Sequence, residues 1–179
     1  IQVKLDALRR GLPQYDYNAT TLMKLIHQGF LAEEGHDIEV HPFCELIDIA
    51  PGEESWRNAV EGYLNTRRFD LFVKEENYDR ALSIYERNKL PYHIHSVGLV
   101  NVAKLDDRSP KPNSLATKVV TSDPDAQRYV NYVLGDIICV DSEQELKYYD
   151  ASITRTVMVY RNRASRATRP EVYATPYIG

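Results

Sequence analysis

Carboxylates are the most numerous side chains in this chain that could carry out chemistry. Six of them lie within or beside predicted strands and turns: Glu45, Asp48, Asp70, Asp136, Asp141 and Glu143. Carboxylates that converge on one point can hold the divalent cations that hydrolyse phosphodiester bonds, as in metal-dependent nucleases. Asp136 and Asp141, however, stand where turns and helix caps favour an acidic side chain. The acids therefore favour structural roles, and a metal-dependent nuclease or another small α/β enzyme is the alternative function.

Two histidines and two cysteines could also bind a metal or act as nucleophiles. His93 and His95 would face the same side of an extended strand, but the spacing places no third ligand beside them. Cys44 and Cys139 each lie in an apolar run, where a free cysteine packs as a small hydrophobe. Neither has a nearby histidine or acid in a pattern that would activate it. We therefore predict no catalytic residue, no metal site and no cofactor.

A group of arginines near the C-terminus is the main basic feature of this chain. The formal net charge is −4, yet residues 151–179 contain several arginines and a single acid, Glu171. Arginines close to tyrosines offer both charge and stacking surface to nucleic acid. We predict weak DNA binding by four residues: Arg161, Arg163, Arg166 and Arg169. The alternative is that these arginines form a solvated face or pair with acids elsewhere in the chain.

The composition is typical of one globular domain, perhaps built of two lobes. A chain of 179 residues is long enough to bury a substantial core. Its hydrophobic content of 43% is ordinary, and no apolar run approaches the length of a membrane span. The cysteine usage and the charged N-terminal sequence favour a reducing cytoplasm over secretion. Because the chain starts without Met, we expect it to be a segment of a longer protein.

Apolar residues at helical spacing predict amphipathic helices over 20–32, 53–64 and 78–88. A further helix is predicted to begin at Asp123-Pro124, because Asp is a good N-cap and Pro suits the first helical position, and to end at Gly135. Short apolar runs predict the strands, at 38–49, 69–73, 96–102, 137–140 and 156–160. The first of these runs is either one strand or two short strands broken at Pro42.

The order helix, strand, helix occurs twice along the chain. Residues 56–82 and 126–149 share an amphipathic helix, a polar turn, a short buried strand, an acidic cap and a second helix. Val60 corresponds to Val130 in this comparison, and the strands correspond as well. The repetition predicts an α/β (α+β) domain made of two pseudo-repeated helix-strand-helix halves around mixed sheets.

Two stretches of the sequence carry a resemblance to a known family. CELIDIAPGEESWRNAVEGYLNTRRFDLFVKEENYDRALSIYERNK resembles the first half of the hinge domain of SMC-family ATPases. DPDAQRYVNYVLGDIICVDSEQEL is similar to the second half, where Leu-Gly-Asp precedes an apolar strand ending in Val-Asp. The resemblance covers residues 38–160 and points to the divergent MukB-like and Wadjet JetC-like branch. The glycine-rich interface segments of ordinary hinges are lacking, since the eight glycines are widely scattered.

The resemblance implies a non-catalytic domain at which two chains pair. Family membership implies a homodimer that joins two coiled-coil arms into a DNA clamp, with ATP hydrolysis in head segments outside this chain. It also implies other SMC-complex subunits, a cytoplasmic, nucleoid-associated location, and a role in plasmid defence or chromosome organisation. The expected boundaries are the end of an incoming coiled-coil helix at 1–10, a first lobe at 11–105, a linker at 106–114, a second lobe at 115–160 and a basic tail leading to the outgoing coil at 161–179.

Tyrosine is abundant, with thirteen in the chain, which is more than a core of this size needs. Because Tyr and Arg are favoured at protein interfaces, we expect some of the tyrosines to line a self-contact. A stand-alone nucleic-acid-binding module is the remaining alternative to the hinge and to the enzyme.

Overall fold

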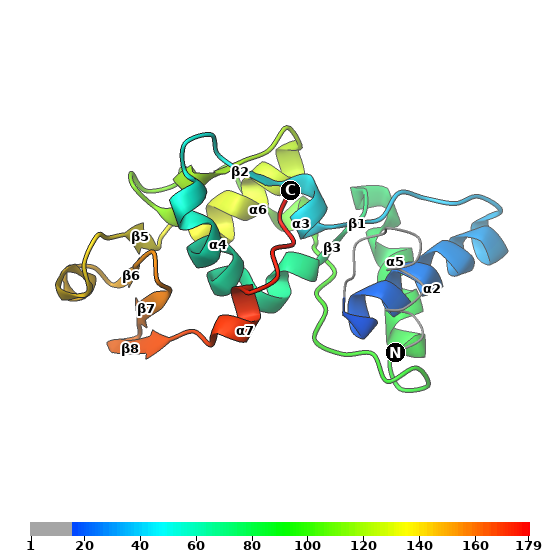
Figure 1. Ribbon diagram of the computed structural model, residues 1–179. Coiled ribbons are helices and arrows are strands. Elements are labelled where there is room, and N and C mark those ends of the chain that lie inside the picture. The colour runs from blue at the N-terminus through cyan, green and yellow to red at the C-terminus, as the bar shows by residue number, and fades with distance from the viewer. Residues whose placement is uncertain (1–15) are drawn as a thin grey trace. The chain divides into compact units, whose positions relative to one another are not determined.

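A computed structural model describes residues 16–179 of the protein (Figure 1). The predicted end of an incoming coiled-coil helix, residues 1–10, lies outside the described residues. The described residues fall into two compact units, the first made of 16–43 and 69–103 and the second of 44–68 and 104–179. None of the helices within the described part of the chain combines the length and the apolar character needed to cross a bilayer.

The units are composed differently from the predicted lobes. The predicted first lobe, 11–105, is shared between both units, because 44–68 packs with the C-terminal part of the chain. The predicted linker at 106–114, second lobe at 115–160 and basic tail at 161–179 all belong to the second unit. The arginine-rich segment is therefore folded into the same unit as residues 44–68.

Two helices of the first unit pack on each other (Figure 1). The helix α2 spans Tyr17–Glu34 and begins at Asp16, whose side chain accepts a hydrogen bond from the Ala19 amide. Its partner α5 spans Tyr78–Asn88, the bounds predicted from the sequence. Ion pairs from the arginines of α5 to the acids that end α2 add to the buried apolar contact.

A small sheet completes the first unit. The strand β1, His41–Pro42, pairs antiparallel with β3, Leu71–Phe72. The rings of Phe43 and Phe72 stack with their centroids 5.6 Å apart. A parallel bridge from Leu71 to Leu99 adds a third segment to this sheet. The short helix α3, Phe43–Leu46, follows β1 directly.

The second unit contains the helices α4, Arg57–Leu64, and α6, Pro124–Leu134. Each buries an apolar stripe, and α6 begins as predicted, with the Asp123 side chain accepting a hydrogen bond of 2.9 Å from the Ala126 amide. The strand β2, Asp48–Ile49, precedes α4 and pairs antiparallel with β4, Val119–Val120, which precedes α6.

The second unit also holds a four-stranded sheet, in the order β5-β6-β7-β8 (Figure 1). The strands are β5, Ile138–Cys139; β6, Ala151–Ile153; β7, Met158–Arg161; and β8, Ala164–Ala167. The strand β5 is parallel to β6, and a 3-10 helix, Glu143–Tyr148, connects them. Its Leu146 packs with Ile138 and Val140 into a buried cluster.

Corresponding hydrogen bonds support the internal duplication. In the first unit, β3 pairs antiparallel with β1, which precedes α4 in the sequence, and parallel with Leu99, which follows α5. In the second unit, β5 pairs antiparallel with Ser114, before α6, and parallel with β6. The Phe43 amide donates to the Asp70 carbonyl at 2.8 Å, and the Leu115 amide donates to the Ile137 carbonyl at the same distance. The predicted α+β class is confirmed.

Candidate functional site

The four predicted DNA-binding arginines lie on the hairpin and short helix that end the second unit. Arg161 closes β7, Arg163 lies in the turn, Arg166 is in β8, and Arg169 caps the helix α7, Pro170–Tyr173. Three of them line a groove of about 470 Å³, together with residues of α4 and α7. Arg163 does not line the groove but borders a smaller hollow. The structure thus brings together Arg161, Arg166 and Arg169.

The register of the β7–β8 hairpin explains this grouping. Arg161 is paired with Ala164 and Val159 is paired with Arg166, and paired residues of an antiparallel sheet lie on the same face. All four of these residues line the groove. Successive residues alternate between faces, so Met158 and Tyr160 lie on the other face, where they pack against the buried cluster of Ile138, Val140 and Leu146.

The three arginines of the groove differ in how they are held. The Arg161 guanidinium bonds to the Asp136 carboxylate at 3.0 Å and lies 5.9 Å from the centre of the Tyr63 ring. Burial alone would lower the pKa of Arg161, but Tyr63 and Asp136 outweigh it and raise that pKa, so the side chain stays charged. Arg166 and Arg169 are exposed and make no ion pair with another residue of 16–179. The groove therefore offers two exposed cationic side chains.

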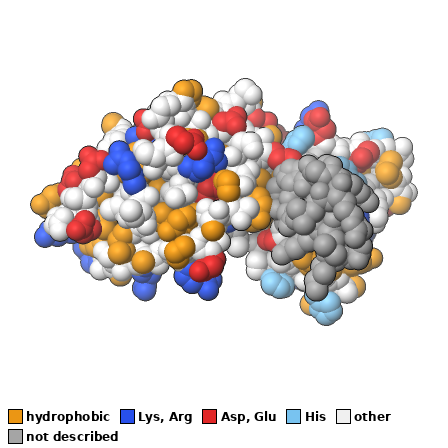
Figure 2. All heavy atoms as spheres, viewed as in Figure 1, with side chains coloured by type: hydrophobic (Ala, Val, Ile, Leu, Met, Phe, Trp, Pro, Cys, Tyr) orange, Lys and Arg blue, Asp and Glu red, His pale blue; other side chains and the backbone are white. Residues whose placement is uncertain are grey.

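Basic side chains do not form one broad surface on the face of the second unit that Figure 2 shows, because lysines and arginines are interspersed there with acidic side chains. Ion pairs such as Lys118–Glu53 and Arg155–Asp141 also place acids beside basic side chains in this unit. Any anion that binds here is expected to contact the groove locally rather than lie along a continuous basic face.

The strand β8 forms an open edge of the four-stranded sheet, since no strand within residues 16–179 pairs with its outer side. The Thr168 amide donates a hydrogen bond to the Val157 carbonyl at 3.1 Å, so these two residues form a hydrogen-bonded pair. This pair determines which of the following residue pairs of β7 and β8 exchange hydrogen bonds. In an antiparallel ladder every second residue exchanges hydrogen bonds with its partner. The backbone N–H and C=O groups of Ser165 and Ala167 therefore point away from β7.

The turn of the hairpin uses two residues in the left-handed region, Asn162 with φ 55° and Arg163 with φ 65°. Replacing Arg163 by glycine is expected to raise the free energy of unfolding by about 0.5 to 1 kcal/mol, because glycine adopts this conformation without a Cβ clash. Urea unfolding would measure the gain. The control Asn162→Gly should gain less, since asparagine already tolerates the conformation, and a loss of stability in Arg163→Gly would contradict the argument.

Known proteins match this chain in structure rather than in sequence: no family sequence model and no curated protein sequence matches it significantly. The Pyrococcus furiosus SMC hinge domain superposes with a TM-score of 0.57 at 14% identity, over 86% of this chain and 90% of that one. The Geobacillus stearothermophilus SMC hinge domain, solved as an asymmetric dimer, gives 0.58 at 14% identity, over 94% and 75%. The chain has the fold of an SMC hinge domain. The folded elbow of cohesin also matches, with a TM-score of 0.59 at 14% identity, over 96% of this chain and 27% of that chain.

The hinge fold places the candidate acids in separate structural contacts. Asp136 bonds to Arg161, and Asp141 bonds to Arg155 at 2.6 Å. Asp70 accepts a hydrogen bond of 2.9 Å from the Gly98 amide. Among the residues that the structure describes, no group of three or more His, Cys, Asp or Glu side chains is arranged to hold a metal ion. The acids that suggested a nuclease thus do not converge.

The histidines and cysteines also have structural settings in the hinge fold. His93 adopts a positive φ of 54° in a turn, so the prediction of an extended strand that aligns it with His95 is wrong. Cys44 and Cys139 are buried free thiols, as predicted. Burial raises the pKa of the Cys139 thiol to about 12, which keeps it protonated and unreactive at neutral pH.

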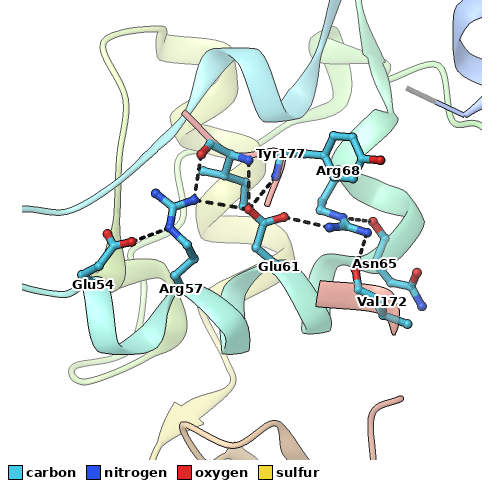
Figure 3. Close-up of polar contacts among 8 residues, drawn as sticks. Glu54, Arg57, Glu61, Asn65, Arg68, Val172 and Tyr177 are labelled. Atoms are coloured by element: carbon cyan, nitrogen blue, oxygen red, sulfur yellow. Dashed lines mark hydrogen bonds and ion pairs between the residues drawn. The ribbon is translucent and has the colours of Figure 1, made fainter. Parts of the chain in front are cut away.

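Sequence reasoning missed a buried ion pair in the second unit of the hinge fold (Figure 3). Glu61 of α4 is fully buried, and its Oε1 accepts a hydrogen bond of 2.8 Å from Nη1 of Arg68, which is 5% exposed. The sequence did carry a signal. Glu61 is three residues before the apolar Leu64, so the two side chains are neighbours on the helix, and a carboxylate beside a buried residue needs a partner.

Proposed function

We propose that this chain is a dimerisation domain, the hinge of an SMC-like ATPase, and that it joins two coiled-coil arms into a DNA clamp. The hinge fold supports the proposal, as does the matching Geobacillus hinge, which was solved as an asymmetric dimer. The function of such a domain is geometric, because it holds two chains in a defined contact and catalyses no reaction.

The open edge of β8 is the observation that carries the proposal. Unpaired N–H and C=O groups along an edge strand are a template for pairing with a strand of another chain. Ser165, Arg166 and Ala167 are all exposed, so a second copy can reach the edge. Large tyrosines are exposed on the same unit, with 53% of Tyr132 and 69% of Tyr148 accessible, and tyrosine suits protein interfaces. We infer that the β8 edge contributes to the self-contact.

Light scattering on the purified domain tests this function. A homodimer is expected to give the molar mass of two chains at micromolar concentration. A mass of one chain that persists to high micromolar concentration would overturn the dimerisation proposal, because an arm-joining contact must hold without other subunits.

The parent protein is proposed to be an ATPase whose head segments lie outside this chain. Other SMC-complex subunits would bind outside the hinge, at the nucleoid in the cytoplasm. The run VLGDIICVDSEQEL favours the MukB-like and Wadjet JetC-like branch, and with it plasmid defence or chromosome organisation.

A second candidate function is weak DNA binding by the arginine groove. Arg166 and Arg169 are exposed and line the same groove as Arg161, so phosphates could contact two or three guanidinium groups at once. The groove is local, which limits the number of phosphates bound and so the affinity.

Reversing the two exposed charges of the groove is expected to weaken binding of a short oligonucleotide by about tenfold to hundredfold, and to lower the salt dependence of binding. Fluorescence anisotropy of the variant Arg166→Glu/Arg169→Glu at two salt concentrations would measure both effects. The matched control is Arg163→Glu, on the same hairpin but outside the groove. Equal weakening by the control and the double variant would mean that net charge, not the groove, binds DNA.

A further inference from the structure

Glu61 of α4 binds the backbone of the C-terminal segment (Figure 3). Its Oε2 accepts hydrogen bonds from the amides of Tyr177 and Ile178, each at 2.9 Å. Glu61 is fully buried and Ile178 is 3% exposed, so these bonds form away from water. A buried carboxylate that accepts two backbone N–H bonds holds the chain strongly, because charge-assisted hydrogen bonds gain strength in a low dielectric.

Two arginines complete this contact. Arg57 donates from Nη1 to the Ile178 carbonyl at 2.8 Å, and Arg68 donates from Nη2 to the Val172 carbonyl at 2.8 Å. The Arg68 guanidinium also lies 5.1 Å from the centre of the Tyr177 ring. Most of these bonds go to backbone atoms, so together the three side chains fix the path of the segment. We call Arg57, Glu61 and Arg68 the clamp, and residues 174–179 the strap.

The clamp contacts a residue that lines the arginine groove. Val172, whose carbonyl Arg68 holds, lines the groove together with Arg169. Beneath α7, Gly62 of α4 leaves no room for a side chain, because an added Cβ would lie 2.7 Å from the Val157 side chain and 3.3 Å from the Tyr173 ring. The helix α7 therefore packs directly on α4 and forms one wall of the groove.

We propose that the contacts between the clamp and the strap form a latch, which couples the path of the strap to the shape of the arginine groove. With the latch closed, α7 rests on α4 and Arg169 stays beside Arg166. Release of the clamp frees the strap, and frees Val172 from Arg68, so that α7, with Arg169, can leave the groove. A change in the path of the strap would then open or close the groove. The latch stands on the contacts of the clamp, and only the identity of the groove's ligand rests on the proposed function.

Amide hydrogen exchange on the whole domain tests the latch without any ligand. The variant Glu61→Gln keeps the shape of the side chain but removes the charge that holds both arginines. We expect exchange at Tyr177 and Ile178 to accelerate by about tenfold to hundredfold. Because the strap and α7 are coupled, the amides of Ala174 and Thr168 should accelerate too; they donate to Pro170 and Val157.

A matched control is Glu54→Gln, since Glu54 bonds to the same Arg57 from a side chain that is 72% exposed. The control should leave all these amides unchanged. Acceleration confined to Tyr177 and Ile178 would overturn the coupling, and unchanged exchange would overturn the latch. Equal acceleration at Val140, which donates to Ile153 in the sheet, would mean global destabilisation and would also overturn it.

A milder variant covers the case in which Glu61→Gln fails to fold. Arg57→Gln removes the bond to the Ile178 carbonyl from a side chain that is 25% exposed, and so leaves no buried charge unpaired. It should accelerate exchange at Ile178 and Ala174 severalfold but not at Val140. These exchange patterns do not depend on DNA binding or on dimerisation. The proposed function can therefore be overturned while the latch stands, and the latch can be overturned while the proposed function stands.

Discussion

Replacing Glu61 by leucine is expected to lower the free energy of unfolding of the domain by about 3 to 5 kcal/mol. Glu61 is fully buried and Arg68 is 5% exposed, so the substitution leaves a buried guanidinium without its carboxylate. It also leaves the amides of Tyr177 and Ile178 without an acceptor. Urea unfolding followed by circular dichroism would measure the loss.

Two further variants make this expectation specific to the buried pair. Glu54→Leu removes an exposed carboxylate that also bonds to Arg57, one of the residues beside Glu61. This variant should change the free energy of unfolding by about 0.5 kcal/mol or less. The double variant Glu61→Leu/Arg68→Met should recover part of the loss, because it removes the unpaired charge as well. A small effect of Glu61→Leu alone, similar to that of the Glu54 control, would contradict the buried network.

Replacing Ser165 by proline is expected to weaken self-association of the domain by about a hundredfold or more, because the ring blocks the open edge of β8. The Ser165 N–H points away from β7, so proline removes no hydrogen bond of the hairpin, and proline is tolerated on an edge of this kind. Sedimentation velocity over a concentration series would measure the change.

Ser165→Ala is the matched control for the edge variant, since it keeps the backbone N–H and should pair as well as the wild type. Thermal unfolding of both variants at high dilution would check that the hairpin is intact. Self-association of Ser165→Pro at wild-type strength would show that the dimer forms through another surface.

The helices could be predicted from the sequence because their signals are local. The cap Asp123 is a short-range feature, and the apolar spacing of 78–88 predicts the bounds of α5. The helix α2 is capped by Asp16, so it begins three residues before the predicted start at residue 20. The run 38–49 shows the limit of such reasoning. The sequence predicts one strand or two short strands broken at Pro42, and the structure has two short strands, β1 and β2, separated by the helix α3, which the sequence did not predict. That break depends on tertiary bonds such as the Phe43 amide to the Asp70 carbonyl.

The candidate site could be predicted only in part, because it too depends on tertiary contacts. Composition pointed to the four arginines, but only the two-residue turn decides that Arg163 leaves the groove that the other three line. The role of Glu61 depends on contacts with residues more than a hundred positions away, such as Ile178. No local pattern encodes such a contact, although a carboxylate next to the buried Leu64 on α4 indicates that a partner is needed.

Amide exchange at Ser165 and Ala167 tests the central claim, pairing through the β8 edge, most directly. Both amides point away from β7, whereas the register makes the Arg166 amide donate within the hairpin. If two copies pair through this edge, Ser165 and Ala167 should be protected at high protein concentration and lose that protection on dilution, while Arg166 stays protected throughout. Unprotected exchange at Ser165 and Ala167 at every concentration would contradict the account.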